Sequence, residues 1–63
     1  ISPINYLVHR RIEEARYLLA QTNYRISDIA NMLGFSSNSY FSQTFHRVVG
    51  VSPSQFRYQN SEL

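Results

Sequence analysis

The sequence predicts an all-α fold of four helices that contain a helix-turn-helix. Three observations support this prediction, and two of them concern the ends of helices. Ser2-Pro3 and Ser52-Pro53 are typical helix starts, and Gly34 and Gly50 stand where helices end. The third observation is that apolar residues between these signals recur every three or four positions, as they do on one face of an α-helix. Capping and apolar spacing agree, so the fold class is well determined by the sequence.

The composition limits the classes of protein to which the chain can belong. Its 63 residues allow one domain at most, or part of one. The chain has no cysteine, which removes disulfides and thiolate metal sites and suits a cytoplasmic location. No apolar run is long enough to cross a membrane, and Ile1 opens no signal-peptide pattern. We therefore expect a membrane-free cytoplasmic protein.

The charges are distributed unevenly along the chain. The formal net charge is only +2, all six permanent cations are arginines, and no acid occurs from Ile29 to Ser61. The four acids are Glu13, Glu14, Asp28 and Glu62. The net charge of +2 alone would favour a solvated surface with a chance gap in its acids. The gap becomes informative only where it coincides with one face of a helix.

The first predicted helix covers residues 3–21 and has two distinct faces. Its apolar arc, interrupted only by Arg11, comprises Ile4, Leu7, Val8, Ile12, Ala15, Leu18 and Leu19. On roughly the opposite face, Tyr6, Arg10 and Tyr17 form a second stripe, which either is solvated or packs against a neighbour absent from this chain. For Arg10 three roles are open: an ion pair with Glu13 or Glu14, orientation of the absent neighbour, or contact with a phosphate.

Three shorter helices are predicted after the polar connection at residues 22–25. The first covers residues 26–33, with Ile26, Ile29, Ala30 and Leu33 directed inward. The second covers residues 38–49, is capped by Ser36 or Ser37, and buries Phe41, Phe45, Val48 and Val49. The last covers residues 53–60 and carries Phe56. The sequence thus divides into a long helix at 3–21, a helix-turn-helix at 26–49 and a closing helix at 53–60.

The spacing from Ala30 to Phe45 is typical of a helix-turn-helix. Two helices that cross closely need a small residue at the crossing, and Ala30 is small. The turn needs a residue at positive φ, which Gly34 supplies. Phe35 is expected to pin the turn, and Phe41 and Phe45 to anchor the second helix. The other face of that helix is then free to enter a groove of DNA.

That free face carries short and medium polar side chains that can hydrogen-bond to base edges. Tyr40 and Arg47 flank it. The residues that we predict to contact bases are Asn38, Ser39, Ser42, Gln43 and His46. An ordinary solvated face usually carries Glu and Lys, and this one carries neither. The sequence therefore favours DNA binding through the major groove.

The chain also resembles a known family over nearly its whole length. The residues that carry the resemblance are Tyr6, Arg10, Ala15, Leu18-Leu19, Ile26, Ile29-Ala30, Gly34-Phe35, Ser39-Tyr40-Phe41-Ser42, Phe45, Gly50, Ser52-Pro53 and Phe56-Arg57. In this order and spacing they are similar to the AraC/XylS-type bacterial transcription regulators. The DNA-binding domain of that family has two homeodomain-like helix-turn-helix units joined by a long helix. The resemblance implies that residues 3–21 are the joining helix, that 26–49 are the second unit, and that 53–60 are the closing helix.

The resemblance implies partners as well. The first helix-turn-helix unit and a sensor domain would complete the regulator, which binds a double-stranded DNA operator and activates transcription by contact with RNA polymerase. The recognition helix would match residues 37–48. Family members often carry Arg at the position of Gln43 and Lys at that of His46. Both departures lower the charge, and Gln43 suggests that adenine is read.

Contacts with phosphates are expected from two helix starts and two arginines. Backbone N–H groups at the starts of helices bind anions. The residues concerned are Ser27, Arg47, Ser54 and Arg57, although for Arg57 a packing role is equally open. The rival function is a helical protein-interaction module that docks on RNA polymerase or on a sensor domain. Such modules usually expose an apolar anchor, and on this face only Tyr40 qualifies.

Catalysis and cofactor binding are not expected. His9 and His46 lie far apart in the sequence and have no cysteine to complete a metal site. Ser, His and Asp are all present, but they fall on predicted helix surfaces without a nucleophile elbow or a Gly-rich oxyanion loop. We therefore predict that the chain is not an enzyme and takes no cofactor.

Overall fold

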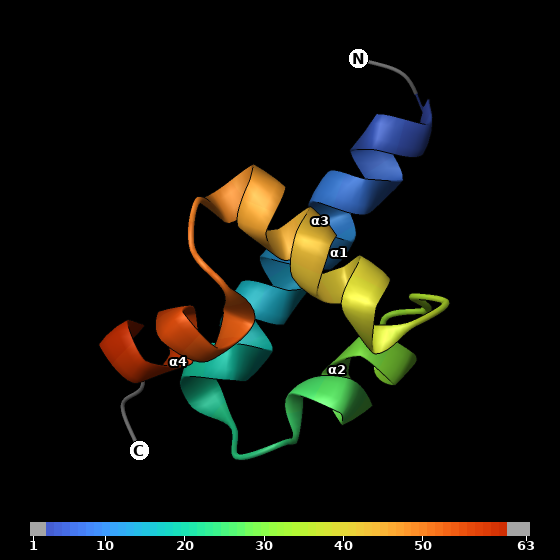
Figure 1. Ribbon diagram of the computed structural model, residues 1–63. Coiled ribbons are helices and arrows are strands. Elements are labelled where there is room, and N and C mark those ends of the chain that lie inside the picture. The colour runs from blue at the N-terminus through green and yellow to red at the C-terminus, as the bar shows by residue number, and fades with distance from the viewer. Residues whose placement is uncertain (1–2, 61–63) are drawn as a thin grey trace.

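The computed structural model describes residues 3–60, with side chains from Asn5 onward, and contains four α-helices in that range. They are α1 (Pro3–Gln21), α2 (Ile26–Met32), α3 (Asn38–Val49) and α4 (Pro53–Asn60) (Figure 1). No strand occurs among the described residues, so the all-α prediction is confirmed. α2 ends at Met32, one residue earlier than predicted, because Leu33 is its C-cap. The predicted cap at Ser2 lies outside the described residues.

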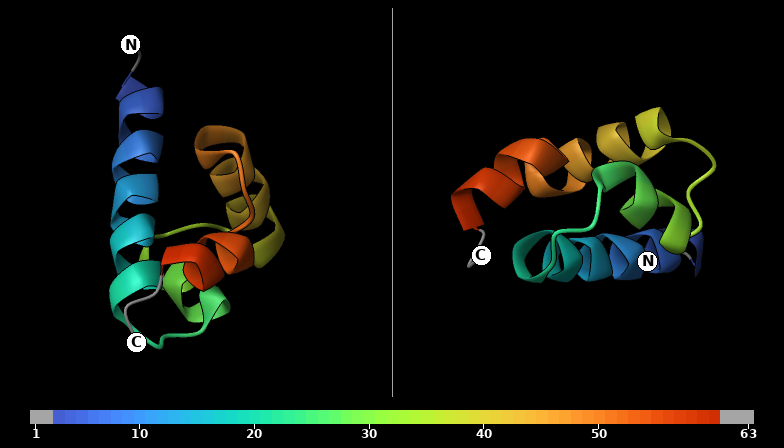
Figure 2. Two further views of the ribbon diagram at one scale, coloured as in Figure 1. Left: turned by 90° about the vertical axis from the view of Figure 1, so that its left-hand side faces the viewer. Right: turned by 90° about the horizontal axis from the view of Figure 1, so that it is seen from below.

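The three short helices all lie on one side of α1 (Figure 2). α4 packs beside the C-terminal part of α1, and α2 and α3 complete the layer. The described chain is elongated along α1, with principal extents of 35 × 19 × 17 Å. One face of α1 is thus covered by α2, α3 and α4, and its other face has no neighbour among the described residues.

The core forms where the four helices meet, and it is apolar. Its buried apolar residues are Ile12, Ala15, Leu19, Ile29, Ala30, Phe35, Phe41 and Phe45. The sequence analysis missed Thr44, which is buried as deeply as these residues, while Val48 and Val49 are only half-buried. Leu7 was predicted to face inward, and this is wrong: it is 52% exposed, and Val8 is the first of the described side chains of α1 that packs against the core.

Four phenylalanine rings form a continuous row through this core. The centroid of Phe35 lies 5.0 Å from that of Phe41, which lies 5.9 Å from Phe45, which lies 5.5 Å from Phe56. All these pairs are tilted or edge-to-face, the geometry that the ring quadrupoles favour. The row joins the turn after α2 to α3 and α4, so these three segments share one packing unit.

The turn between α2 and α3 is a Schellman motif. Gly34 has a φ of 82°. Its N–H donates to the Asn31 carbonyl at 3.1 Å, and the N–H of Phe35 donates to the Ala30 carbonyl at 3.0 Å. These are the two bonds that close a helix through a left-handed residue. The guanidinium of Arg11 covers the turn, since a Cβ on Gly34 would lie 3.7 Å from its nearest nitrogen.

Both ends of α3 and the start of α4 are capped as the sequence predicts. The Ser37 hydroxyl accepts the N–H of Tyr40 at 3.0 Å, which identifies Ser37 rather than Ser36 as the N-cap. Gly50, at a φ of 100°, closes α3 by donating its N–H to the His46 carbonyl. The Ser52 hydroxyl accepts the N–H of Gln55. The ends of α3 are therefore fixed by the chain itself.

We expect Gly34→Val to lower the free energy of unfolding by more than about 1–2 kcal/mol, because a β-branched residue resists positive φ. The space around a new Cβ is ordinary, so the loss arises from the backbone rather than from a clash. Thermal and urea unfolding would measure it. Gly34→Asn is the control, with a smaller loss, since Asn tolerates the left-handed region. A Val variant with wild-type stability would contradict the left-handed turn.

Candidate nucleic-acid interface

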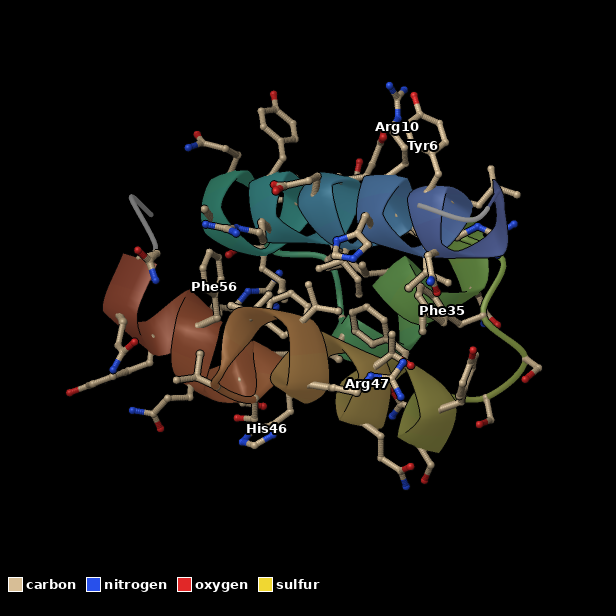
Figure 3. All side chains as sticks on the ribbon, turned by 90° about the horizontal axis from the view of Figure 1, so that it is seen from above. Tyr6, Arg10, Phe35, His46, Arg47 and Phe56 are labelled. Carbon is tan, nitrogen blue, oxygen red and sulfur yellow. The ribbon has the colours of Figure 1, made fainter. Side chains whose placement is uncertain are left out.

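The face of α3 that points away from the core is polar and exposed. Ser39, Gln43 and His46 are exposed on it, and Ser42 at its margin is half-buried. Asn38 is exposed at the first turn of the helix. Figure 3 shows His46 on the side of α3 that faces away from α1. The structure therefore brings the predicted base-contacting residues together along one helix.

The rotation of α3 that creates this face follows from its buried residues. At 100° per residue, the buried side chains of Phe41, Thr44 and Phe45 share one arc. Ser39 and Gln43 fall on the opposite arc. One edge of this arc carries Tyr40 and Arg47, which are seven positions apart and hence almost aligned along the helix. The free face thus has Asn38 at its N-terminal tip, Ser39 and Gln43 at its centre, and Tyr40 and Arg47 at one edge.

The charge of this face suits a polyanion. The sequence from Ile29 to Ser61 contains no carboxylate, so α3, α4 and their connection bring no repulsion toward phosphates. His46 and Arg47 lie in the last turn of α3, where the helix dipole favours positive charge. Asp28, in the first turn of α2, is the acid closest to α3 along the chain. A phosphate at the start of α2 would be repelled by this carboxylate.

The two serines predicted to contact phosphates are both exposed at helix starts. Ser27 is the second residue of α2, which has no side-chain cap. Ser54 is the second residue of α4, next to the buried Pro53. In α4 the N–H groups of Gln55 and Phe56 are taken by Ser52. Because α2 carries Asp28 and α4 carries no acid in its first turn, Ser54 is the better placed of the two.

Arg57 is occupied within the fold, which favours the packing role over contact with phosphate. Its Nε donates to the Leu19 carbonyl at 3.0 Å, and its Nη2 donates to the Thr22 carbonyl at 3.1 Å. The last carbonyls of a helix have no partner within the helix itself. Arg57 of α4 supplies hydrogen-bond donors to these carbonyls, and its side chain therefore ties α4 to the C-terminal end of α1. Periodicity could not reveal this role, because the two partners lie 35 and 38 residues away.

The outer face of α1 is exposed in this chain. Tyr6 is 52% and Tyr17 66% exposed, and Figure 3 shows Tyr6 and Arg10 directed away from the other helices. Arg10 lies between two shallow hollows, one lined by Tyr6, Leu7 and Leu33 and the other by Tyr17, with Glu14 shared by both.

The ion pair that was one of three roles considered for Arg10 is formed by a different arginine. Within the described residues, Glu13 pairs with Arg16 at 3.7 Å. Arg16 also lies over the ring of Phe56, 5.7 Å from its centroid. Arg16 therefore helps to hold α4 against α1, and Arg10 makes no ion pair in the described part of the chain.

Comparison with known proteins finds the same fold in a transcriptional regulator. A protein-family model described as "Helix-turn-helix domain" matches residues 1–59. The structure of a transcriptional regulator of the AraC-type DNA-binding-domain-containing proteins from Chromobacterium violaceum superposes with a TM-score of 0.94. It is 34% identical in sequence, and the match covers 98% of this chain and 55% of that one. The chain belongs to the AraC-type helix-turn-helix family.

Relatives of this AraC-type domain are named as transcription activators. The transcriptional activator AggR of Escherichia coli is 46% identical over 50 residues, which are 79% of this chain and 19% of that protein. The HTH-type transcriptional activator RhaR of Escherichia coli strain K12 is 44% identical over 57 residues, 90% of this chain and 20% of that protein. The chain thus spans about a fifth of the length of the curated relatives it matches.

The described part of this AraC-type domain contains neither a membrane-spanning helix nor a cluster of metal-binding side chains. None of the helices described for it is both long and apolar enough to cross a membrane. Over residues 3–60, no three His, Asp or Glu side chains gather in a way that could hold a metal ion.

In this AraC-type domain we expect Arg57→Ala to lower the free energy of unfolding by about 1–3 kcal/mol, because two carbonyls at the end of α1 lose a charged donor. Urea unfolding measures the loss. Arg47→Ala is the matched control: Arg47 is exposed, and its stability effect should stay within about 0.5 kcal/mol. If Arg57→Ala leaves stability unchanged and instead weakens the salt dependence of DNA binding, Arg57 contacts phosphate after all.

Proposed function

We propose that this chain binds double-stranded DNA sequence-specifically, with α3 in the major groove, as one part of a bacterial transcription regulator. The observation that carries the proposal is the exposed, acid-free polar face of α3. The helix-turn-helix motif places its second helix in the major groove, with the N-terminal residues against base edges. On α3 those residues are Asn38, Ser39, Ser42 and Gln43, with His46 one turn further on.

The proposed contacts fall into two classes. The centre of the free face, with Ser39, Gln43 and His46, would read bases. Arg47 at the edge and Ser54 at the start of α4 would hold the backbone, which positions the helix without reading sequence. Ser27 is retained as a weaker candidate because of Asp28 beside it. The expected ligand is an operator in duplex DNA, and no cofactor is expected to take part.

The rest of the regulator is proposed to cover the outer face of α1. The curated relatives are more than four times as long as this chain, and α1 exposes two tyrosines on a face that no other helix of the described residues covers. A first helix-turn-helix unit packed there would make α1 the joining helix of a two-unit domain. From the relatives named as activators, we also propose that the whole cytoplasmic protein activates transcription. Contact with RNA polymerase is proposed from the family resemblance alone.

Docking of α3 on another protein is the competing function. Its free face offers little apolar area, since Tyr40 is 47% exposed and its neighbours there are polar. The salt dependence of binding to random duplex DNA separates the two functions. DNA binding predicts that log K falls steeply and linearly with log salt, because phosphate contacts release counterions. A flat response would support protein docking instead.

We expect Gln43→Arg to change the preferred base at one operator position from A to G, by roughly 1–3 kcal/mol. An amide donates and accepts at once and so matches N6 and N7 of adenine, whereas a guanidinium forks onto O6 and N7 of guanine. Sequencing of the duplexes selected by the full-length protein measures the change. Gln43→Ala should relax that position alone and leave the salt slope nearly unchanged, because a neutral amide releases no counterion.

The control for Gln43 lies one turn away on the same helix. Arg47→Ala should weaken binding to all sequences alike and make the salt slope shallower by about one unit. If Gln43→Ala also weakens every sequence equally, Gln43 positions the helix and reads no base.

We expect the Tyr6 and Tyr17 side chains to be accessible in this chain alone and protected in the full-length regulator. The physical reason is the exposed amphiphilic face of α1, which a neighbouring unit would bury. Nitration of tyrosines, followed by mass spectrometry, measures their accessibility. Tyr58, which is 87% exposed on α4, provides the internal control and should react in both proteins. Equal reactivity of Tyr6 and Tyr17 in the two proteins would contradict a covering unit.

A further inference from the structure

We propose that Tyr40 holds the DNA backbone, its phenolic hydroxyl donating a hydrogen bond to a phosphate at one edge of α3. This inference rests on the proposed function and deepens it. It concerns a residue that the sequence placed on the flank of the free face without a role. Three features of the described structure support it: a fixed ring, a free hydroxyl and a position at the edge of the helix.

The ring of Tyr40 is held in place by its neighbours. Its centroid lies 5.7 Å from that of Phe35 with an angle of 58° between the planes. Its backbone N–H is fixed by the Ser37 hydroxyl at 3.0 Å. Among the tyrosines of residues 3–60, Tyr40 alone packs against another ring. A side chain that is ordered before binding loses less conformational entropy when it contacts a ligand.

The hydroxyl of Tyr40 is free to meet a ligand. The side chain is 47% exposed, and no described residue forms a hydrogen bond with the hydroxyl. A phenol is both a donor and an acceptor, and it usually finds a partner when its surroundings become dry. In the groove that α3 is proposed to enter, the acceptors at the edge of the helix are phosphate oxygens.

The position of Tyr40 favours phosphate over a base edge. Tyr40 and Arg47 lie on the same edge of α3, separated by about 10 Å along the helix axis. Ser39 and Gln43 occupy the centre, which faces the floor of the groove. Side chains at the edge of a recognition helix meet the backbone that walls the groove, and such contacts fix the register of the protein on the duplex. Tyr40 and Arg47 would together grip one strand.

The decisive variant is Tyr40→Phe, which keeps the ring on Phe35 and removes only the hydroxyl. In the full-length protein we expect the Kd for every duplex to rise by the same factor, roughly threefold to tenfold. The selected sequences, the salt slope and the Tm should stay as in wild type. The variant loses only a neutral hydroxyl that is exposed in the free protein and contacts no base. Tyr58→Phe is the matched control: Tyr58 is more exposed, lies on α4 and packs on no described ring, so its Kd should not change.

Interference by phosphate ethylation then locates the contact. Wild type should be sensitive to ethylation at a phosphate to which Tyr40→Phe is indifferent, and Arg47→Ala should lose sensitivity at a different phosphate of the same strand. An unchanged Kd for Tyr40→Phe would overturn the inference, and so would a changed base preference at one position. A fall in Tm and affinity without loss of sensitivity at any phosphate would show a purely structural role. Failure of the wild-type protein to bind any duplex would overturn the proposed function as well.

Discussion

The edge-to-face packing of Phe35 on Phe41 at 5.0 Å is the contact on which the arrangement of the binding face depends. Phe35 is the last residue of the Schellman turn, so the end of α2 and the rotation of α3 are set by the same pair of rings. Phe45 and Phe56 continue the row into α4. Because Phe41 and Phe45 both point inward, Ser39 and Gln43 have no alternative but to point outward. The binding face is thus a consequence of the core rather than a separate feature.

A second constraint is polar and fixes α4 on α1. Arg57 of α4 donates hydrogen bonds to the carbonyls of Leu19 and Thr22, and Arg16 of α1 lies over the ring of Phe56. Two arginines, one from each helix, therefore act across the same contact. In a chain of 63 residues the apolar core is small, so ties of this kind matter for stability. They also fix where α4 lies on α1, and hence where Ser54 lies relative to the free face of α3.

Local signals made most of this fold predictable, and long-range contacts limited the rest. The glycine stops, the serine caps and the spacing of Phe41 and Phe45 act within a few residues, and the structure follows them closely. The role of Arg57 depends on carbonyls more than thirty residues away, which no periodicity reveals. Leu7 fits the apolar arc of α1 but lies beyond the helices that would cover it. For the candidate site, the polar face of α3 was predictable from the helix wheel. The packing of the Tyr40 ring on Phe35 was not, because it depends on where the turn places Phe35 in three dimensions.

The measurement that tests the account most directly is the set of intermolecular nuclear Overhauser effects between the protein and an operator duplex found by selection. We expect the aromatic row to turn one defined face of α3 toward DNA. Base protons should then show contacts to the side chains of Ser39, Gln43 and His46, and none to Phe41 or Phe45. Contacts that come instead from Tyr6 and Tyr17 of α1, with α3 silent, would contradict it.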